Sequence, residues 1–308
     1  MTILLSLTGE QAIPNLIPFW QAREYLSAAF VVSERTEPIA WQLSRAIKVD
    51  PDLHQLQVLP PITVQPYDLQ TVRGILTRWI TQRQQAGQNV VMNITGGTKV
   101  MTMAAVQAVH DTGVPMLYVC TEENQIITYR SDGTEISREA IRVNITAAQY
   151  MAAHGLEISD NPQFDPAAGP ESHPPKAGDD LEQEVFQKLC DAHCFDDVRK
   201  NVFIRKPVPG GWVRNELDIM VVRNGRMAVG SCKSRKKTVS SFDLNRYLYE
   251  LFSLSSRESA GIYCGKALIL ASDVAVHTSL DRARTMKVRV IRGADLERIA
   301  EIFMEISQ

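Results

Sequence analysis

The chain has 308 residues, which is long for one domain and comfortable for two. It is 44% hydrophobic and 22% charged with a net charge of −2, the composition of a folded globular protein with a real core. Its longest apolar runs are strand-length, which excludes a membrane span, and the apolar N-terminus lacks the basic residues of a signal peptide. Five scattered cysteines indicate a reducing compartment, so we expect a cytoplasmic protein without a membrane partner.

The first 136 residues alternate strand-like and helix-like patterns. The predicted strands are 3–7, 29–33, 56–60, 89–94, 116–120 and 126–129. The predicted helices are 14–25, 38–47, 68–85 and 100–110, the third with Asp68 as its N-cap. This order predicts an α/β domain, Rossmann-like, with a mostly parallel sheet and helices on both of its faces.

The stretch Thr95-Gly96-Gly97-Thr98-Lys99 lies between a predicted strand and a predicted helix. Free amide groups and the positive end of the helix dipole make such a turn a place to hold an anion. The glycines let the backbone come close to a ligand, and the threonines and Lys99 add donors and a cation. It is not a Walker A loop, because Thr98 precedes the lysine and a valine follows it. The alternative is a plain strand–turn–helix in which glycine serves packing.

A second polar loop, residues 8–15, follows the first predicted strand and carries the pattern Gln-x-x-Pro-Asn. Ligands bind open α/β sheets at the carboxyl ends of strands, where both loops lie. The two loops together resemble the ligand motifs of CARF domains, the CRISPR-associated Rossmann-fold sensors. The resemblance implies a homodimer that binds a cyclic oligoadenylate across its two-fold axis, and it favours cyclic tetra-adenylate. The ligand-binding residues that it implies are Thr8, Gln11, Asn15, Ser33, Thr95, Gly96, Gly97, Thr98 and Lys99.

A second α/β unit follows a bridging segment, with a helix from about Ala147, and a proline-rich linker over residues 159–180. Its predicted strands are 197–204, 215–222, 227–232, 267–271 and 288–291. Its predicted helices are 181–193, 243–255, 274–285 and 294–306.

Asn224-Gly225 is a strong hairpin signal between two of these strands. A type I′ turn there places Asp218 opposite Ser231 and Glu216 opposite Lys233, all on one face of the sheet. Two carboxylates and a lysine on one face suit a metal site in which the lysine stabilises developing charge. The alternative is a structural Glu–Lys pair across the strands.

The pattern of Glu182, Asp218 and Lys233 resembles that of PD-(D/E)xK nucleases, which have a restriction-endonuclease-like fold. The resemblance implies catalysis with Mn²⁺ or Mg²⁺, with Glu182 as the acid of the first helix, Asp218 as the central metal ligand and Lys233 as the motif lysine. That family has Glu or Asp two residues before the lysine, and this chain has Ser231. We expect Glu216 or Glu182 to supply the missing charge, which gives Asp218, Glu182 and Glu216 as metal ligands.

The segment from residue 199 to residue 246 holds twelve Lys or Arg and three acids. Its cations include Arg235, Lys236, Lys237 and Arg246, which suit a nucleic-acid backbone or a solvated loop. Phe242, Tyr247 and Tyr249 could stack bases, although their helical spacing favours core positions for some of them. Cys190, His193 and Cys194 have no second ligand pair nearby, so we expect no zinc site.

These patterns predict a sensor domain over residues 1–136, a bridge over 137–180 and a nuclease-like domain over 181–308. The function that the two resemblances imply is that of a cyclic oligoadenylate-activated, metal-dependent nuclease that cleaves DNA, RNA or both in type III CRISPR defence. The alternative, favoured by Ser231, is a sensor whose weakened or inactive nuclease-like domain binds nucleic acid or a partner. A repair-type resolvase would leave the loop over residues 95–99 unexplained.

Overall fold

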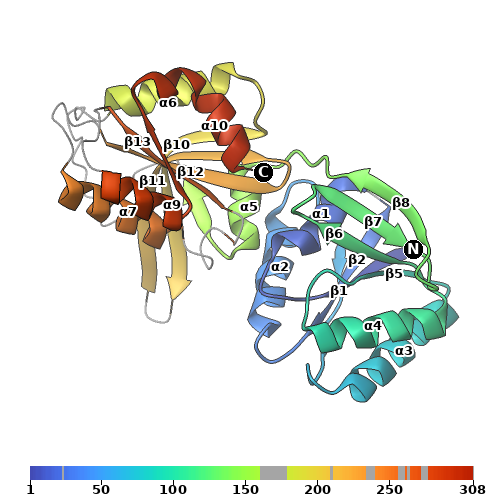
Figure 1. Ribbon diagram of the computed structural model, residues 1–308. Helices are drawn as coiled ribbons and strands as arrows, with labels where there is room; N and C mark the ends of the chain where they lie inside the picture. Colours follow the sequence, from blue (N-terminus) through green and yellow to red (C-terminus); the bar gives the residue numbers. More distant parts are fainter. Residues whose placement is uncertain are drawn as a thin grey trace. The chain divides into compact units, whose positions relative to one another are not determined.

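The computed structural model describes residues 1–22, 24–159, 179–208, 211–233, 240–255, 261, 264–271 and 277–307. It divides into two compact units, Met1–Val143 with Ala152–Gly155, and Asn144–Met151 with Leu156–Gln308 (Figure 1). The predicted linker over residues 159–180 lies almost wholly outside the described residues. No helix in the described ranges combines the length and the apolar character needed to cross a membrane.

The first unit is built on one sheet whose central strands are parallel. Its strands are β1 (Thr2–Leu7), β2 (Tyr25–Val32), β3 (Gln57–Val58), β4 (Ile62–Thr63), β5 (Asn89–Asn93), β6 (Met116–Cys120), β7 (Gln125–Tyr129) and β8 (Glu135–Ala140). Their order is β3-β2-β1-β5-β6-β7-β8, and β4 also pairs with β2. β1 pairs in parallel with both β2 and β5, whereas β6, β7 and β8 are antiparallel to one another. The predicted mostly parallel sheet is confirmed.

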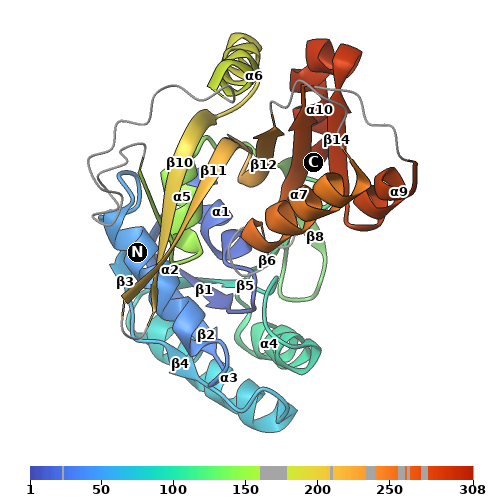
Figure 2. The ribbon, with the colours of Figure 1, turned by 90° about the vertical axis from the view of Figure 1, so that its left-hand side faces the viewer.

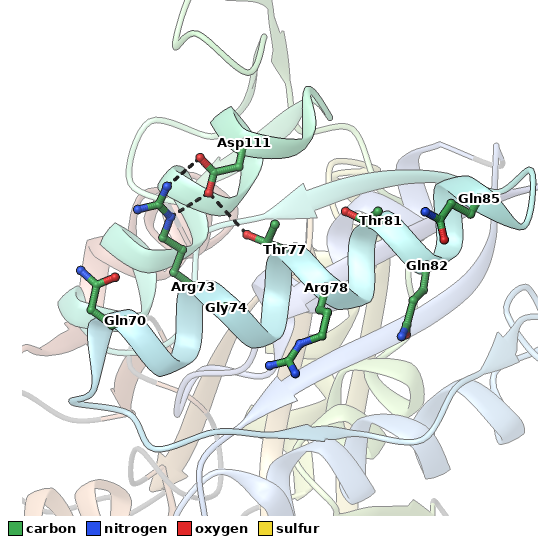
Figure 3. Close-up of a pocket in the computed structure, with 9 residues that line it drawn as sticks. All are labelled: Gln70, Arg73, Gly74, Thr77, Arg78, Thr81, Gln82, Gln85 and Asp111. Atoms are coloured by element: carbon green, nitrogen blue, oxygen red, sulfur yellow. Dashed lines mark hydrogen bonds and ion pairs between the residues drawn. The ribbon is translucent and has the colours of Figure 1, made fainter.

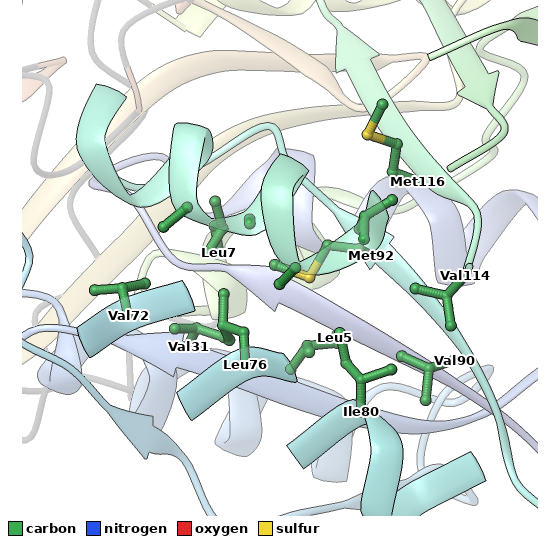
Figure 4. Packing of buried hydrophobic residues seen from close by; sticks show 14 of the residues in the cluster. Leu5, Leu7, Val31, Val72, Leu76, Ile80, Val90, Met92, Val114 and Met116 are labelled. Atoms are coloured by element: carbon green, nitrogen blue, oxygen red, sulfur yellow. The ribbon is translucent and has the colours of Figure 1, made fainter. Parts of the chain in front are cut away.

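Helices cover both faces of this sheet, as Figures 1 and 2 show. They are α1 (Ile13–Gln21), α2 (Glu37–Val49), α3 (Leu69–Gln85) and α4 (Lys99–Thr112). Leu5 and Met92 of neighbouring strands pack with Leu76 of α3 and Ala105 of α4 in one buried cluster (Figure 4). The middle of β1 is apolar on consecutive residues because a strand covered by helices on both sides buries both of its faces.

The predicted elements of this unit are confirmed in type, with errors in extent. The helix predicted over 14–25 ends at Gln21, the strand predicted over 29–33 already begins at Tyr25, and the strand predicted over 56–60 is only Gln57–Val58. Tyr25 is buried in β2, and its ring packs edge-on against Phe19 with 5.8 Å between ring centroids. Asp68 caps α3 as predicted, accepting a hydrogen bond from the Thr71 amide at 3.1 Å. The short β4 and the polar β8 were not predicted, because neither carries a strand-length apolar pattern.

The second unit is also α/β. Its strands are β9 (Glu157–Ser159), β10 (Asp197–Val208), β11 (Gly211–Arg223), β12 (Arg226–Lys233), β13 (Gly265–Leu270) and β14 (Val288–Arg292). Its helices are α6 (Asp179–Asp191), α7 (Ser241–Leu254), α9 (His277–Thr285), the 3-10 helix η2 (Gly293–Arg298) and α10 (Ile299–Ile306), and α5 (Ala147–Ala153) precedes β9. The sheet order is β14-β13-β12-β11-β10-β9.

Helices α6 and α10 lie on one face of this sheet, and α7 and α9 lie on the other (Figure 1). Ile219 and Cys232 of the central strands pack with Val185 of α6 and Phe303 of α10. Because side chains alternate along a strand, Asp218 and Ser231 belong to the opposite face, the one that α7 covers.

Candidate functional site

The loops after β1 and β5 meet at the carboxyl edge of the first sheet. The chain leaves β1 towards β2 on one side and later returns to β5 on the other side. The topological switch point of the sheet therefore lies between β1 and β5, and this is where open α/β sheets bind ligands. The loop that carries Thr8 and Gln11 and the loop that carries residues 95–98 both border it.

The backbones of these two loops are in direct contact. A Cβ atom built on Gly96 would lie 2.1 Å from the Leu7 carbonyl oxygen and 2.7 Å from the Gly9 amide nitrogen. Gly97 has a φ of +78°, in the left-handed region that other residues rarely adopt. Both glycines are therefore required by the fold of the loop itself, whether or not a ligand binds there.

The helix that follows this loop is capped and begins with a cation. Thr98 Oγ1 accepts a hydrogen bond from the Met101 amide at 3.2 Å and donates one to the Pro66 carbonyl at 2.8 Å. Lys99 is the first residue of α4 and is exposed. The helix dipole and the ammonium group together favour an anion at this position.

Four of the predicted ligand residues are buried or bonded within the protein, although the Thr8 hydroxyl and Asn15 Oδ1 have no hydrogen-bond partner among the described residues. Thr95 Oγ1 donates to Asn93 Oδ1 at 2.6 Å and accepts from the Val119 amide at 2.8 Å, so this hydroxyl ties β5 to β6. Thr8 and Ser33 are buried, and Ser33 forms the turn that begins α2. Asn15 is 1% exposed and donates to the Gln11 carbonyl at 3.0 Å.

The other five predicted residues reach the surface. Gly97 and Lys99 are exposed, and Gln11, Gly96 and Thr98 are half-buried. A ligand at the switch point would therefore meet the second loop and Gln11 directly, whereas the other four side chains are buried or bonded within the loops.

The predicted hairpin register in the second unit is confirmed from the turn up to Ile219. Asn224 and Gly225 both have positive φ, as a type I′ turn requires, and Arg223 pairs with Arg226. The ladder between β11 and β12 ends at the pair Ile219 and Gly230.

Beyond this point the Asp218 side chain joins the two strands. Asp218 Oδ2 accepts hydrogen bonds from Ser231 Oγ at 3.1 Å and from the Cys232 amide at 2.7 Å. Asp218 and Ser231 therefore come together as predicted.

Lys233 has a different partner from the one predicted. Its Nζ lies 3.9 Å from Glu250 Oε1 and 5.4 Å from the centre of the Tyr247 ring, both on α7. Glu216 is exposed in β11, where its pairing in the sheet is with Phe203 of β10. The ladder to β12 has ended before Glu216, so the predicted pairing of Glu216 with Lys233 is wrong. Glu250 was missed because nothing in the sequence links α7 to β12.

Glu182 of α6 lies near the same strand. Burial raises the pKa of the Cys232 thiol, and the carboxylates of Asp218 and Glu182 raise it further, whereas Lys233 lowers it. Cys232 faces the core under α6, so the influence of Glu182 reaches β12 from that side of the sheet.

A divalent ion fits Asp218 in its chemistry, although no ready-made cage is present. Asp218 is half-buried, and its Oδ1 accepts no hydrogen bond from the part of the chain that the structure describes. A carboxylate oxygen of this kind is a ligand that Mg²⁺ and Mn²⁺ prefer. Within the described ranges, no three His, Cys, Asp or Glu side chains gather to hold a metal ion.

The aromatic residues predicted on α7 divide into two groups. Tyr247 is 5% exposed and belongs to the core, whereas Phe242 and Tyr249 are 77% and 58% exposed. The guanidinium of Arg246 lies 5.2 Å from the centre of the Tyr247 ring. The predicted cations Arg235, Lys236 and Lys237 lie outside the described residues.

A hollow on the outer side of α3 is separate from the loops at the switch point. It is lined by Gln70, Arg73, Gly74, Thr77, Arg78, Thr81, Gln82, Gln85 and Asp111 (Figure 3). Arg73 donates two hydrogen bonds to Asp111 of α4, at 2.7 and 2.8 Å, so its charge is already compensated. This ion pair links α3 to α4, and we assign no binding or catalytic role to the hollow.

The fold defines a protein of two α/β units, the first Rossmann-like with polar loops at its switch point and the second with Asp218 and Lys233 on one face of its sheet. Residues 3–150 match the family model of the Card1 CARF domain, and residues 175–308 match that of the Card1-like endonuclease domain. The chain belongs to the family of proteins that combine these two domains, as the resemblance of the motifs predicted.

Two solved structures share the fold over the whole chain. Can2 from Sulfobacillus thermosulfidooxidans, solved in complex with cyclic tetra-adenylate, has 17% identity, a TM-score of 0.78 and 100% coverage of both chains. Protein VC1899 from Vibrio cholerae has 15% identity, a TM-score of 0.81 and 99% coverage of both chains. A type III CRISPR defence DNA nuclease activated by cyclic oligoadenylate has 15% identity and a TM-score of 0.60, over 87% of this chain and 45% of that one. No curated protein matches the sequence significantly.

Proposed function

We propose that this protein is a nuclease of type III CRISPR defence that a cyclic oligoadenylate activates. The observation that carries the proposal is the backbone contact between the two loops at the switch point between β1 and β5. Residues 175–308 of the same chain match an endonuclease family. The sensor comprises residues 1–136, the bridge 137–180 and the nuclease 181–308. All five cysteines are free of disulfides, which supports a cytoplasmic location.

The ligand is a cyclic oligoadenylate because the exposed groups suit phosphates. Gly96, Gly97 and Thr98 present backbone close to the surface, and Lys99 supplies a cation at the start of α4. Cyclic tetra-adenylate is the ring that we favour, since the structure of Can2 contains it and shares the fold of this chain. The ligand lies across the two-fold axis of a homodimer, so two copies of this loop hold one ring.

The nuclease acts on DNA or RNA phosphodiesters. Asp218 would hold Mn²⁺ or Mg²⁺, with Glu182 and Glu216 as the further acids that the sequence suggests. When bound, such an ion polarises the phosphate and lowers the pKa of a water that attacks it. Lys233 lies on the same strand face as Ser231 and stabilises the charge that develops on the phosphate.

A second function is favoured by Ser231. A hydroxyl is a poorer ligand for hard cations than a carboxylate, and here it bonds to Asp218 instead of adding a charge. In this alternative the protein is a sensor whose nuclease domain is weak or inactive and binds nucleic acid or a partner.

A cleavage assay with Mn²⁺, on plasmid and on RNA, with and without cyclic tetra-adenylate, separates these functions. The proposed function requires cleavage that depends on both the ligand and the metal. Ligand binding by calorimetry without cleavage would favour the alternative. Absence of ligand binding would contradict both.

A further inference from the structure

We infer that Glu250 of α7 is the second carboxylate of the nuclease metal site, replacing the acid that Ser231 lacks. The inference rests on the proposed nuclease function and names a residue outside the motif. Glu250 lies seventeen positions beyond Lys233 in the sequence, on a helix, whereas the motif residues lie on two strands.

Lys233 links Glu250 to the motif residues on the two strands. Asp218 is bonded to Ser231, and Lys233 follows Ser231 by two residues on the same strand, so its side chain is on the same face. The Lys233 Nζ reaches Glu250 Oε1 at 3.9 Å. This carboxylate therefore lies on the face of the sheet that carries Asp218.

The helix holds Glu250 there by its packing. One side of α7 is buried, namely Leu244, Tyr247, Leu248 and Leu251. Ser240 caps the helix, since its Oγ accepts a hydrogen bond from the Asp243 amide at 3.1 Å. Tyr247 lies one turn before Glu250, and the same lysine contacts both. Glu250 keeps a side chain that is 51% exposed, so it remains accessible to a cation.

The other two acids are less well placed. Glu216 is exposed in a part of β11 where the ladder to β12 has ended. Glu182 belongs to α6, which covers the opposite face of the sheet, where Cys232 is buried. Glu250, in contrast, contacts the motif lysine directly.

Two carboxylates are sufficient for this chemistry. Mg²⁺ sites in enzymes that act on phosphates commonly use one or two carboxylates together with water and the substrate phosphates. The distance of 3.9 Å between Lys233 and Glu250 is longer than a hydrogen bond. Glu250 can therefore turn towards a cation without breaking a tight contact, and Lys233 stays beside the phosphate.

The test is calorimetric titration of Mn²⁺ into the full-length protein, without substrate. We expect Glu250→Gln and Asp218→Asn each to weaken Mn²⁺ binding by roughly tenfold or more, since each removes a charge next to the ion. Glu305→Gln, at an exposed position of α10 on the other face of the sheet, is the matched control and should leave the affinity unchanged. Equal melting temperatures would show that all variants are folded.

A double variant adds a second criterion. Ser231→Glu should restore Mn²⁺ affinity in the Glu250→Gln protein, because it returns a carboxylate to the usual position of the family. If Asp218→Asn weakens binding and Glu250→Gln does not, the inference is overturned and the nuclease function stands. If the parent protein binds no Mn²⁺, the nuclease function itself fails, and the inference fails with it.

Discussion

At Gly96 a requirement of the fold coincides with a proposed ligand contact. Its missing side chain lets the loop after β5 touch the loop after β1, since a Cβ atom would lie 2.1 Å from the Leu7 carbonyl oxygen. Packing and phosphate approach are therefore not competing explanations for this glycine.

Gly96→Ala should destabilise the protein by about 1–3 kcal/mol, the usual cost of forcing atoms into a packed site. The matched control is Gly74→Ala, because a Cβ atom there meets nothing within 4 Å. Gly74 lies within α3, so this control should gain roughly 0.5–1 kcal/mol from helix propensity. Urea unfolding measures both, and a Gly96→Ala protein as stable as its parent would contradict the loop contact.

Lys99→Ala should weaken binding of cyclic tetra-adenylate by about 1–3 kcal/mol, the range for a hydrogen bond to a charged group. Lys48, which is exposed near the end of α2, provides a control of the same residue type. Calorimetry that finds equal affinity for the Lys99→Ala and Lys48→Ala proteins would count against this pocket.

At the scale of elements, α3 and α4 are joined by charge as well as by apolar packing. Hydrogen bonds from Arg73 hold the pKa of Asp111 below its usual value. Both side chains are partly exposed, so salt screens the pair and its contribution is small.

Asp111→Asn should therefore destabilise the protein at neutral pH, and the loss should disappear in acid. Because the folded-state pKa is depressed, the stabilisation is present above the unfolded pKa of about 3.9 and is lost as the pH falls through the folded value. Urea midpoints of parent and variant, measured from pH 7 down to below about pH 3, should converge. A difference that stays constant with pH would exclude the ion pair as its source.

At the scale of the whole molecule, sensing and cleavage are assigned to different domains. Asp218→Ala or Lys233→Ala should abolish cleavage and leave the affinity for cyclic tetra-adenylate in the absence of substrate unchanged. Calorimetry and a plasmid assay on the same samples measure the two properties. An Asp218→Ala protein that cleaves as fast as its parent would refute the assigned nuclease site.

The proposed activation of one domain by the other requires a difference in ligand affinity. A ligand can activate the nuclease only if it binds the active arrangement more tightly than the inactive one. By linkage, a ligand that changes the affinity of the nuclease for nucleic acid by some factor has its own affinity changed by nucleic acid by that same factor.

The sequence by itself determined the features that depend on neighbouring residues. Runs of apolar residues identified the parallel strands, Asn224-Gly225 determined the hairpin register, and Asp68 marked the start of α3. The loop motifs and the Asp218 and Lys233 pattern identified the family, because close backbone approach and metal chemistry restrict the residues allowed at fixed spacing.

The tertiary structure decided which of these side chains are available. Thr95 has the residue type of a ligand-binding group, yet it bonds Val119, a partner 24 residues away that β6 supplies. Lys233 was expected beside Glu216, yet the end of the ladder and the packing of α7 place it beside Glu250. Contacts of this kind join elements that are distant in the chain, and their energy comes from burying whole helix and strand faces. The spacing of residues along the chain does not indicate which distant elements pack together, so these partners are known only from the folded structure.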